Sequence, residues 1–441
     1  LWFTPIVLVY SPTAPYRSLL LLGLIATTAG LKGVLFPIVH HLGSDASAGR
    51  VGRSVSRVYL GNVLGSTLGP IVTGFVLLDV LSVESTGALI AVGTATLGTV
   101  VLLAVSRRSG RAAAGAALVA AVCAAVLTEP PRTVVAVAAG AGPEDRVKHV
   151  IQNKHGIIHV LAEEAPGLGD QTLGGNMFDG RIAVDMAINA NYLDRAYLMA
   201  VLHPAPRRVL VIGLSSGAWT RVISGLPGIE QVDVVEINPG YLELIRRYDV
   251  VAPLLDDPRV HIHIDDGRRW LRAHPKKRYD LIFQNTTYHW RAYASQLLSA
   301  DYLREARSHL APGGILAVNT TGSLDAYRTA MAVFPHVLRY RSFAYMSEQP
   351  LVRRADAEQV LRRARVGDAP AFTDALFEGH AIGAQLVHGA LVTAQEHLAA
   401  TGAPVAPEVI TDLNLVTEYR HGWRPGVGWL QPLLPRTNPL P

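Results

Sequence analysis

Three short motifs place glycines and carboxylates where a nucleoside could bind. The segment Gly213-Leu-Ser-Ser-Gly217 is a glycine turn, Glu236 follows Gly213 by 23 residues, and Asp265-Asp266-Gly267 comes next. Glycines allow close backbone approach to a ligand. A carboxylate about 20 residues further on can accept hydrogen bonds from both hydroxyls of a ribose. A later carboxylate can accept a hydrogen bond from the amino group of adenine. Together the three motifs predict a nucleoside site.

A second cluster of polar and aromatic residues follows further along the chain, in the run Asn285-Thr-Thr-Tyr-His-Trp-Arg291. His289 could act as a general base, because the pKa of histidine lies near neutral pH. Arg291 could bind a carboxylate or phosphate, and Trp219 and Trp290 could stack on a planar or cationic group. In the alternative interpretation, His289 and Arg291 bind loop backbone and the tryptophans pack in the interior.

Strands and helices must alternate to bring these motifs to one edge. The pattern predicts five strands, at Arg208–Ile212, Gln231–Ile237, Val260–Ile264, Tyr279–Gln284 and Gly314–Asn319. Helices are expected between them, at Ala218–Ser224, Gly240–Tyr248, Gly267–Arg272 and Ala300–Leu310. This alternation predicts a parallel, doubly wound sheet, and such sheets bind ligands outside the carboxyl ends of their strands.

The first 128 residues have a different character. The chain is 49% hydrophobic and only 17% charged, against about 25% charged in an average protein. Apolar runs of roughly the length that crosses a bilayer as helix occupy Ser18–Leu42, Tyr59–Leu78 and Gly87–Val105, with a marginal run at Ala112–Leu127 and the end of another at Leu1–Tyr10. We therefore expect transmembrane helices. Because the sequence does not begin with Met, we also expect further spans before residue 1.

The net charge of +5 belongs to this apolar part. Residues 1–128 contain eight Lys and Arg and three acids, whereas the remainder contains 32 of each sign. The loops around Arg53 and Arg108 should be cytoplasmic by the positive-inside rule, and the acidic loop Asp79–Thr86 should face outward. The side of the later domain depends on whether Ala112–Leu127 crosses, which the sequence leaves open. A neutral second half predicts no nucleic-acid partner.

Metal and hydrolase chemistry fit the sequence less well. Cys123 is the single cysteine, and His261 and His263 alternate on one predicted strand, so we expect no metal site. Gly213–Gly217 also matches the Gly-x-Ser-x-Gly pattern of hydrolases, but that interpretation leaves Glu236 and Asp266 without a role.

The motifs together resemble the spermidine synthase (polyamine aminopropyltransferase) family, especially its membrane-fused bacterial branch. The resemblance rests on Val209-Leu-Val-Ile-Gly-Leu-Ser-Ser-Gly217, Val234-Val-Glu-Ile-Asn-Pro239, Asp257-Pro-Arg-Val260, Asp265-Asp-Gly-Arg268, Leu310-Ala-Pro-Gly-Gly314 and Phe178-Asp-Gly-Arg-Ile182. It implies a methyltransferase-like Rossmann domain, with a small N-terminal β-hairpin region, that binds S-adenosylmethionine or its decarboxylated form as co-substrate. By the resemblance, Gly213, Ser215, Ser216 and Gly217 would pass the sulfonium and its alkyl arm. Glu236 would hold the ribose, Ile237 would pack on the adenine, and Asp265, Asp266 and Gly267 would lie at its amino group.

The departures from the family pattern concern its acids. Ser216 stands where the family has an aspartate, and Asn285 and Tyr288 replace the two aspartates of the run after the fourth strand. Amine attack requires loss of a proton, which Asn cannot accept. We therefore expect Asn285, Tyr288, His289 and Arg291 to form the catalytic region of an aminopropyl- or methyltransferase. The alternative is a non-catalytic nucleoside-binding or transport-coupled membrane module.

The expected organisation has four parts. They are transmembrane helices at 1–128, a small β-rich region at 147–205, a Rossmann-like domain at 206–350, and a helical C-terminal extension and tail at 351–441, with helices at Ala355–Ala364 and Gly379–Ala400. Val409–Tyr419 resembles the segment that closes the site in the fused branch. The expected partners are a small-molecule acceptor, a polyamine or another, and a lipid bilayer, by resemblance the bacterial inner (plasma) membrane. The sequence does not decide whether the protein forms a homo-oligomer.

Overall fold

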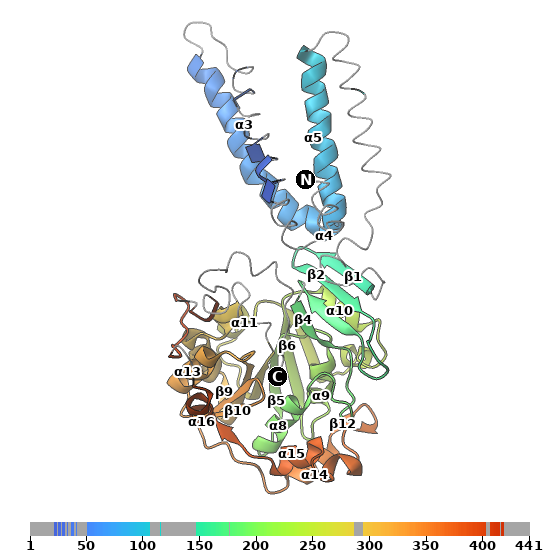
Figure 1. The fold of residues 1–441 in the computed structure, drawn as a ribbon, viewed down its shortest axis with the longest axis vertical. Helices are drawn as coiled ribbons and strands as arrows, with labels where there is room; N and C mark the ends of the chain where they lie inside the picture. The colour runs from blue at the N-terminus through green and yellow to red at the C-terminus, as the bar shows by residue number, and fades with distance from the viewer. Residues whose placement is uncertain are drawn as a thin grey trace. The chain divides into compact units, whose positions relative to one another are not determined.

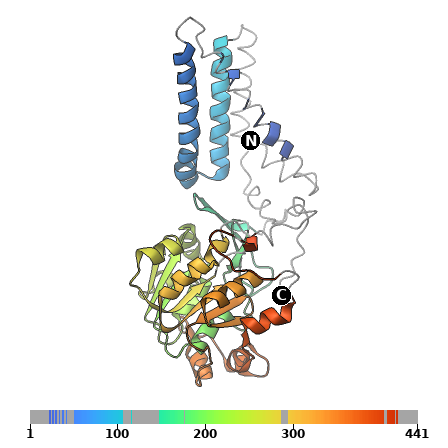
Figure 2. The same ribbon diagram turned by 90° about the vertical axis from the view of Figure 1, so that its left-hand side faces the viewer.

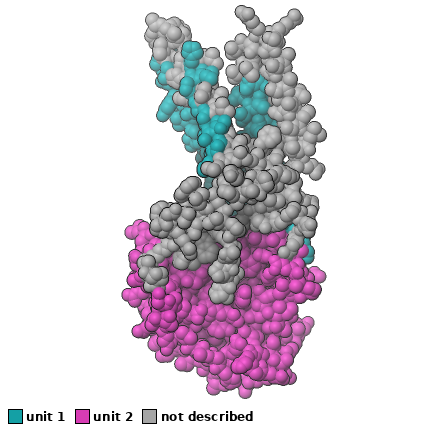
Figure 3. All heavy atoms as spheres, in the orientation of Figure 1, with its two compact units in different colours: residues 1–157, 429–441 teal, residues 158–428 magenta. Residues whose placement is uncertain are grey.

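The structure is a computed structural model, and it forms two compact units. It describes residues 51–105, 147–175, 177–285, 294–402, 406–414 and 416–418, with isolated helical positions between 22 and 41 and at 115. One unit comprises residues 1–157 and 429–441, and the other comprises residues 158–428 (Figure 3).

The described part of the first unit contains two long apolar helical segments. Helix α3 (Val51–Val72) continues through a π-helical turn, η1 (Thr73–Leu77), into α4 (Leu78–Val80), and α5 (Val83–Val105) follows. Val55–Val80 and Val83–Val100 are long and apolar enough to cross a membrane. The predicted runs Tyr59–Leu78 and Gly87–Val105 lie in these helices. The other predicted spans lie outside the described residues, apart from isolated positions.

The corner between α4 and α5 binds the first strand of the chain, β1 (Val147–Asn153). Gln152 accepts from the backbone N–H of Val83 at 2.9 Å and donates to Glu84 at 3.1 Å. Lys154, just beyond the strand, forms an ion pair with Asp79 at 2.9 Å. The acids of the predicted outward loop are therefore bonded to the segment that begins the β-rich half of the chain.

The described residues form three sheets, of which two are large and the third is a two-stranded sheet near the C-terminus. Strands β1, β2 (Gly156–Leu161), β3 (Gln171–Gly174) and β4 (Met177–Arg181) form a four-stranded sheet in sequential order. The larger sheet has the order β14-β10-β11-β9-β8-β5-β6-β7 (Figure 1). Its strands are β5 (Arg208–Ile212), β6 (Gln231–Glu236), β7 (Val260–Ile264), β8 (Tyr279–Gln284), β9 (Leu310–Asn319), β10 (His336–Tyr340), β11 (Phe343–Ser347) and β14 (Val392–Thr393).

The strands from β9 to β7 in this order are parallel, whereas β11, β10 and β14 extend the sheet with antiparallel pairs. The predicted α/β architecture is confirmed. Four predicted strands match within one residue, and the fifth begins four residues earlier than expected, at Leu310.

Helices cover both faces of the parallel strands. Successive side chains of a strand point to opposite faces, so apolar side chains on both faces need a covering layer. Leu210 and Leu316 pack in one cluster with side chains of α11 (Gly267–Ala273), α12 (Ala300–Ser308) and α13 (Leu324–Val333). On the opposite face Phe283 stacks on Trp219 of α9 (Ala218–Ser224), and Tyr345 donates to the Arg195 carbonyl of α8 (Asp194–Leu202). Figure 2 shows the sheet between its helices from the side. The remaining elements here are α10 (Gly240–Ile245), η2 (Ala252–Leu255) and η3 (Ala294–Leu297).

The C-terminal region is less helical than predicted. It contains α14 (Ala357–Arg363), β12 (Arg365–Val366), β13 (Ala369–Pro370), η4 (Asp374–Phe377), α15 (Ile382–His388) and α16 (Ala394–Thr401), besides β14. The predicted single helix over Gly379–Ala400 is wrong. Helix α15 ends at His388, before Gly389, and Thr393 starts a new helix through a reciprocal capping box with Glu396.

Candidate active site

The glycine turn after β5 has a backbone that only glycine adopts easily at two positions. Gly213 and Gly217 have φ of +92° and +78°, in the left-handed region. A Cβ on Gly213 would lie 3.1 Å from the carbonyl oxygen of Asn285, and one on Gly217 would lie 2.9 Å from Ile245. The turn therefore touches both the end of β8 and helix α10.

Glu236, at the end of β6, accepts hydrogen bonds from the backbone of this turn. One carboxylate oxygen accepts from the N–H groups of Leu214 at 2.7 Å and Ser215 at 3.4 Å, and the other accepts from Asn238 at 2.8 Å. A carboxylate offers about four lone-pair sites, so capacity remains for a ribose hydroxyl. Burial raises the pKa of Glu236, with a smaller contribution from Asp179, and the backbone hydrogen bonds oppose this shift.

The Asp265-Asp266-Gly267 motif forms the start of α11. Asp266 caps the helix by accepting from the N–H of Arg269 at 2.9 Å, and Asp265 accepts from the N–H of Asp266 and pairs with Arg269. A Cβ on Gly267 would lie 2.7 Å from Ile212, so only glycine lets α11 pack this closely on β5. Asp266 is exposed, and its second oxygen accepts no hydrogen bond from the described residues.

Two exposed isoleucines flank the ends of β6 and β7. Ile237 is 55% exposed, and Ile264, in the edge strand β7, is 42% exposed. Ile264 pairs in register with Glu236. Ile264 was missed in the sequence; its signal was its place just before Asp265. Ile237 follows Glu236 and Ile264 precedes Asp265-Asp266 in the sequence, so both exposed side chains are candidates to contact a planar base.

The hydroxyl groups of the two serines in the turn bind the small sheet. Ser215 donates its hydroxyl to the carbonyl of Asp179, and Ser216 donates to that of Arg181 at 3.1 Å. Both carbonyls belong to β4. The two hydroxyls therefore bond the small sheet to the turn, and the contact of Ser215 and Ser216 with a nucleoside stays a prediction.

Asp179 is a carboxylate that the sequence analysis did not single out as a site residue. Its side chain accepts a hydrogen bond from the hydroxyl of Tyr241, in α10, and its charge contributes to the raised pKa of Glu236. The only sequence signal was its place in the hairpin motif Phe178–Ile182. One acid therefore lies at the turn although Ser216 itself is not acidic.

An amide pair occupies the end of β8. Asn285 accepts at Oδ1 from Asn319 at 2.9 Å, and Asn319 accepts from the hydroxyl of Ser342 at 3.1 Å. Ser342 in turn accepts from Arg195 Nη1 at 3.0 Å. A chain of hydrogen bonds thus runs from the end of β8 across β9 to the start of α8. Predicted site residues Tyr288, His289 and Arg291, with Trp290, lie outside the described residues.

The alternative interpretation of Trp219, packing in the interior, is the correct one. Its ring is 7% exposed and stacks on Phe283 and Phe343, with ring centroids 5.0 and 5.7 Å away. The Arg195 guanidinium lies 5.9 Å from its centroid. Trp219 therefore contacts a cation of the protein itself.

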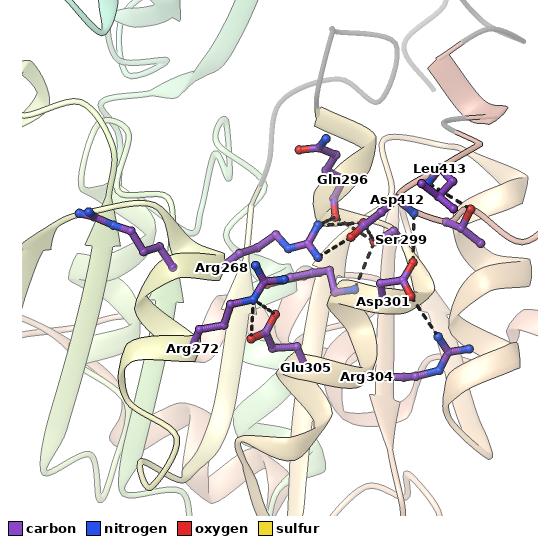
Figure 4. A network of polar contacts seen from close by, with 12 residues as sticks. Arg268, Arg272, Gln296, Ser299, Asp301, Arg304, Glu305, Asp412 and Leu413 are labelled. Carbon is purple, nitrogen blue, oxygen red and sulfur yellow. Dashed lines mark hydrogen bonds and ion pairs between the residues drawn. The ribbon is translucent and has the colours of Figure 1, made fainter.

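Residues between 406 and 418 form hydrogen bonds with the helices at the edge of the sheet where Glu236 and Asp266 lie (Figure 4). Asp412 accepts two hydrogen bonds from Arg268, at 2.8 and 2.7 Å, and one from Ser299 at 2.6 Å. Glu418 accepts from the hydroxyl of Ser295 at 2.6 Å. Arg268 directly follows Gly267, and Ser295 lies in η3, so this segment supports both the nucleoside motif and the element that follows residues 286–293.

Comparison with known proteins identifies one domain. The model of the spermine/spermidine synthase domain matches residues 196–331. A polyamine aminopropyltransferase of Mycobacterium tuberculosis (strain ATCC 25618 / H37Rv) is 28% identical over 340 residues, which cover 73% of this chain and 61% of that protein. Polyamine aminopropyltransferase 2 of Streptomyces coelicolor is 28% identical over 323 residues, covering 70% and 56%. The chain thus spans about three fifths of the length of these relatives.

Two further similarities are more local. A polyamine aminopropyltransferase of Streptococcus pneumoniae serotype 4 is 43% identical over 91 residues, which cover 20% of this chain and 31% of that protein. The crystal structure of spermidine synthase from Thermotoga maritima aligns with a TM-score of 0.39 at 22% identity, covering 46% of this chain and 73% of that one.

Proposed function

From the premise that residues 196–331 carry a spermine/spermidine synthase domain, we propose that the protein is a spermidine synthase-like transferase. It binds S-adenosylmethionine or decarboxylated S-adenosylmethionine and transfers a methyl or aminopropyl group to a small-molecule acceptor. The observation that carries this proposal is the position of Glu236. It is buried against the glycine turn with acceptor capacity left, beside exposed Ile237 and within the same edge as Asp266.

The chemistry needs positioning more than activation. The acceptor's lone pair attacks the carbon bonded to the sulfonium, the carbon–sulfur bond breaks, and its electron pair stays on sulfur as a neutral thioether. An amine acceptor releases its proton to His289 or to water. Holding the two reactants in line is the main contribution expected of the protein, and in this proposal Asn285, Tyr288 and Arg291 orient the acceptor.

Calorimetry on the full chain in a lipid nanodisc tests the nucleoside site. We expect at least one of the two nucleosides to bind, and Glu236→Gln to weaken that binding. Glu243→Gln is a matched control, because Glu243 lies on the exposed side of α10 in an ion pair with Arg247. A folded protein that binds neither nucleoside contradicts the proposal.

A non-catalytic binding or transport-coupled module is the second candidate. Asn285 supports it, since its side-chain oxygen accepts from another amide and offers no base. This candidate predicts nucleoside binding without turnover over a panel of amine and methyl acceptors. Turnover that is lost in Asn285→Ala or His289→Ala excludes it.

We propose further that the helices of the first unit anchor the protein in a bilayer. Val55–Val80 and Val83–Val100 have suitable length and hydropathy. The exposed apolar side chains on them include Leu64, Leu68 and Phe75, the last 69% exposed, which would be costly in water over this length. Partition of the full chain into the membrane fraction, resistant to carbonate washing, tests this location.

A further inference from the structure

Arg195, in the first turn of α8, is a cation surrounded by aromatic rings. Its guanidinium carbon lies 4.9 Å from the ring centroid of Tyr192, 5.3 Å from that of Phe343 and 5.9 Å from that of Trp219. Nη1 donates to Ser342, whereas Nε is buried and has no hydrogen-bond partner among the described residues. The ring faces attract the cation but leave this N–H unsatisfied.

No carboxylate of the described residues forms an ion pair with Arg195. The adjacent Asp194 is fully buried and bonded elsewhere, to Arg341 at 2.6 Å, to Tyr340 at 2.8 Å and to Asn189 at 2.8 Å. Residues 286–293 contain no Asp or Glu. A half-buried charge without a counter-ion among the described residues is costly, and burial lowers the pKa of Arg195 accordingly. An unsatisfied group of this kind in a native structure calls for an explanation.

The position of Arg195 relates it to the proposed nucleoside site. Its hydrogen-bonded chain runs through Ser342 and Asn319 to Asn285, whose backbone carbonyl borders Gly213. The run 285–291 also lacks the two aspartates of the family pattern, which could pair with the ammonium groups of a polyamine. A partly exposed guanidinium here attracts an anion and repels a diamine.

We propose that Arg195 binds a carboxylate of a ligand beside the nucleoside site, an inference that rests on the proposed function. Two sources share this chemistry. One is the methionine carboxylate of intact S-adenosylmethionine, which the decarboxylated nucleoside lacks. The other is an acceptor that carries a carboxylate where a polyamine carries an ammonium group. Arginine suits either, because its planar fork matches a carboxylate.

Calorimetry with two matched pairs of probes tests the inference on the full chain in nanodiscs. The first pair is S-adenosylmethionine and decarboxylated S-adenosylmethionine. The second pair, added to the nucleoside-bound protein, is 5-aminopentanoate and 1,4-diaminobutane, which differ only in a carboxylate against an ammonium group at one end of the same four-methylene chain. In at least one pair we expect the wild type to bind the carboxylate member about tenfold or more tightly. The pair that shows the preference identifies the source.

Variants of Arg195 connect that preference to the side chain. Arg195→Met should reduce the preference to about one, Arg195→Lys should retain part of it, and Arg207→Met, at an exposed ion pair with Glu230, should leave it unchanged. If Arg195→Met does not fold, the carboxylate preferences of Arg195→Lys and of the wild type decide whether the inference holds. Nucleoside binding with no carboxylate preference in either pair, or an unchanged preference in Arg195→Met or Arg195→Lys, overturns the inference alone. Failure of the folded wild type to bind either nucleoside overturns the proposed function and this inference together.

Discussion

Glu236 accepts the backbone N–H of Leu214 at 2.7 Å, across 22 positions of the sequence. This hydrogen bond ties the end of β6 to the turn that follows β5, and it fixes the carboxylate beside the expected ribose. The same residue therefore shapes the turn and offers its remaining lone pair to a ligand.

Replacement of Glu236 by Gln should weaken nucleoside binding by about 10- to 100-fold, because an NH2 group would face backbone N–H donors and one acceptor would be lost. Calorimetric dissociation constants for the wild type and Glu236→Gln provide the measurement. Glu243→Gln, which alters an exposed ion pair on α10, should bind like the wild type. Equal affinities in all three proteins would remove Glu236 from the site.

Nucleoside affinity should fall as the pH is lowered, starting above the usual titration range of glutamate. Ribose hydroxyls donate to the deprotonated carboxylate, so proton binding to Glu236 competes with the ligand. The pKa of Glu236 is raised, mainly by burial and secondarily by Asp179, which moves this competition to higher pH. Dissociation constants measured between about pH 5 and 8 test the sign, and the decline should be absent in Glu236→Gln. Affinity that rises on acidification would contradict the assignment.

The sequence predicted the parts of this site that depend on neighbouring residues, and it did not predict contacts between residues far apart along the chain. Strand ends were predictable because the period of apolar residues and the glycine turn are local, and they placed Gly213, Glu236 and Asp266 at one edge. The partners of Ser215 and Ser216 were not predictable, since their hydroxyls reach carbonyls about 35 positions earlier in β4.

The roles of aromatic and charged residues outside any motif were still harder to predict. Trp219 follows the turn directly and was considered a ligand-stacking residue, but the neighbouring strands β8 and β11 supply Phe283 and Phe343 to pack on it. Arg195 has no sequence signal, because its environment comes from α8, α9 and β11 together.

Loss of the Asp412 charge should destabilise the α/β unit. Asp412 is about one third exposed and accepts from Arg268 and Ser299, so Asp412→Asn should cost about 1–2 kcal/mol. For a unit of this size that lowers the unfolding temperature by about 2–8 °C, measurable by a calorimetric scan of the full chain. The hydrogen bond from Arg268 depresses the pKa of Asp412. Its contribution is therefore present above the unfolded pKa and is lost as the pH falls through the folded one, where wild type and variant should converge.

The control for this experiment is another aspartate paired with arginine. Asp374 forms an ion pair with Arg362 but is 88% exposed, so Asp374→Asn should change the unfolding temperature little. Similar losses in Asp374→Asn and Asp412→Asn would show that the bidentate geometry at Arg268 has no special effect.

The two ends of α3 should face opposite sides of the membrane if this helix spans it. Arg53 lies near the start of α3, and Asp79, in α4 at the far end of the apolar segment Val55–Val80, pairs with Lys154 beside β1. The β-rich half of the chain therefore starts on the side of Asp79, and the positive-inside rule places that side away from the cytoplasm. In a Cys123→Ser background, a membrane-impermeant maleimide should label Leu413→Cys in intact cells, because Leu413 is 97% exposed.

Arg53→Cys is the paired position, and it should react only after permeabilisation. The comparison is internal, since both variants carry one introduced thiol in the same background and Arg53 is also exposed. Labelling of Arg53→Cys with protection of Leu413→Cys in intact cells would show the opposite orientation, with Leu413 on the cytosolic side. Equal labelling of both would show that the helix from Val55 to Val80 does not separate them, against a bilayer-spanning role for α3.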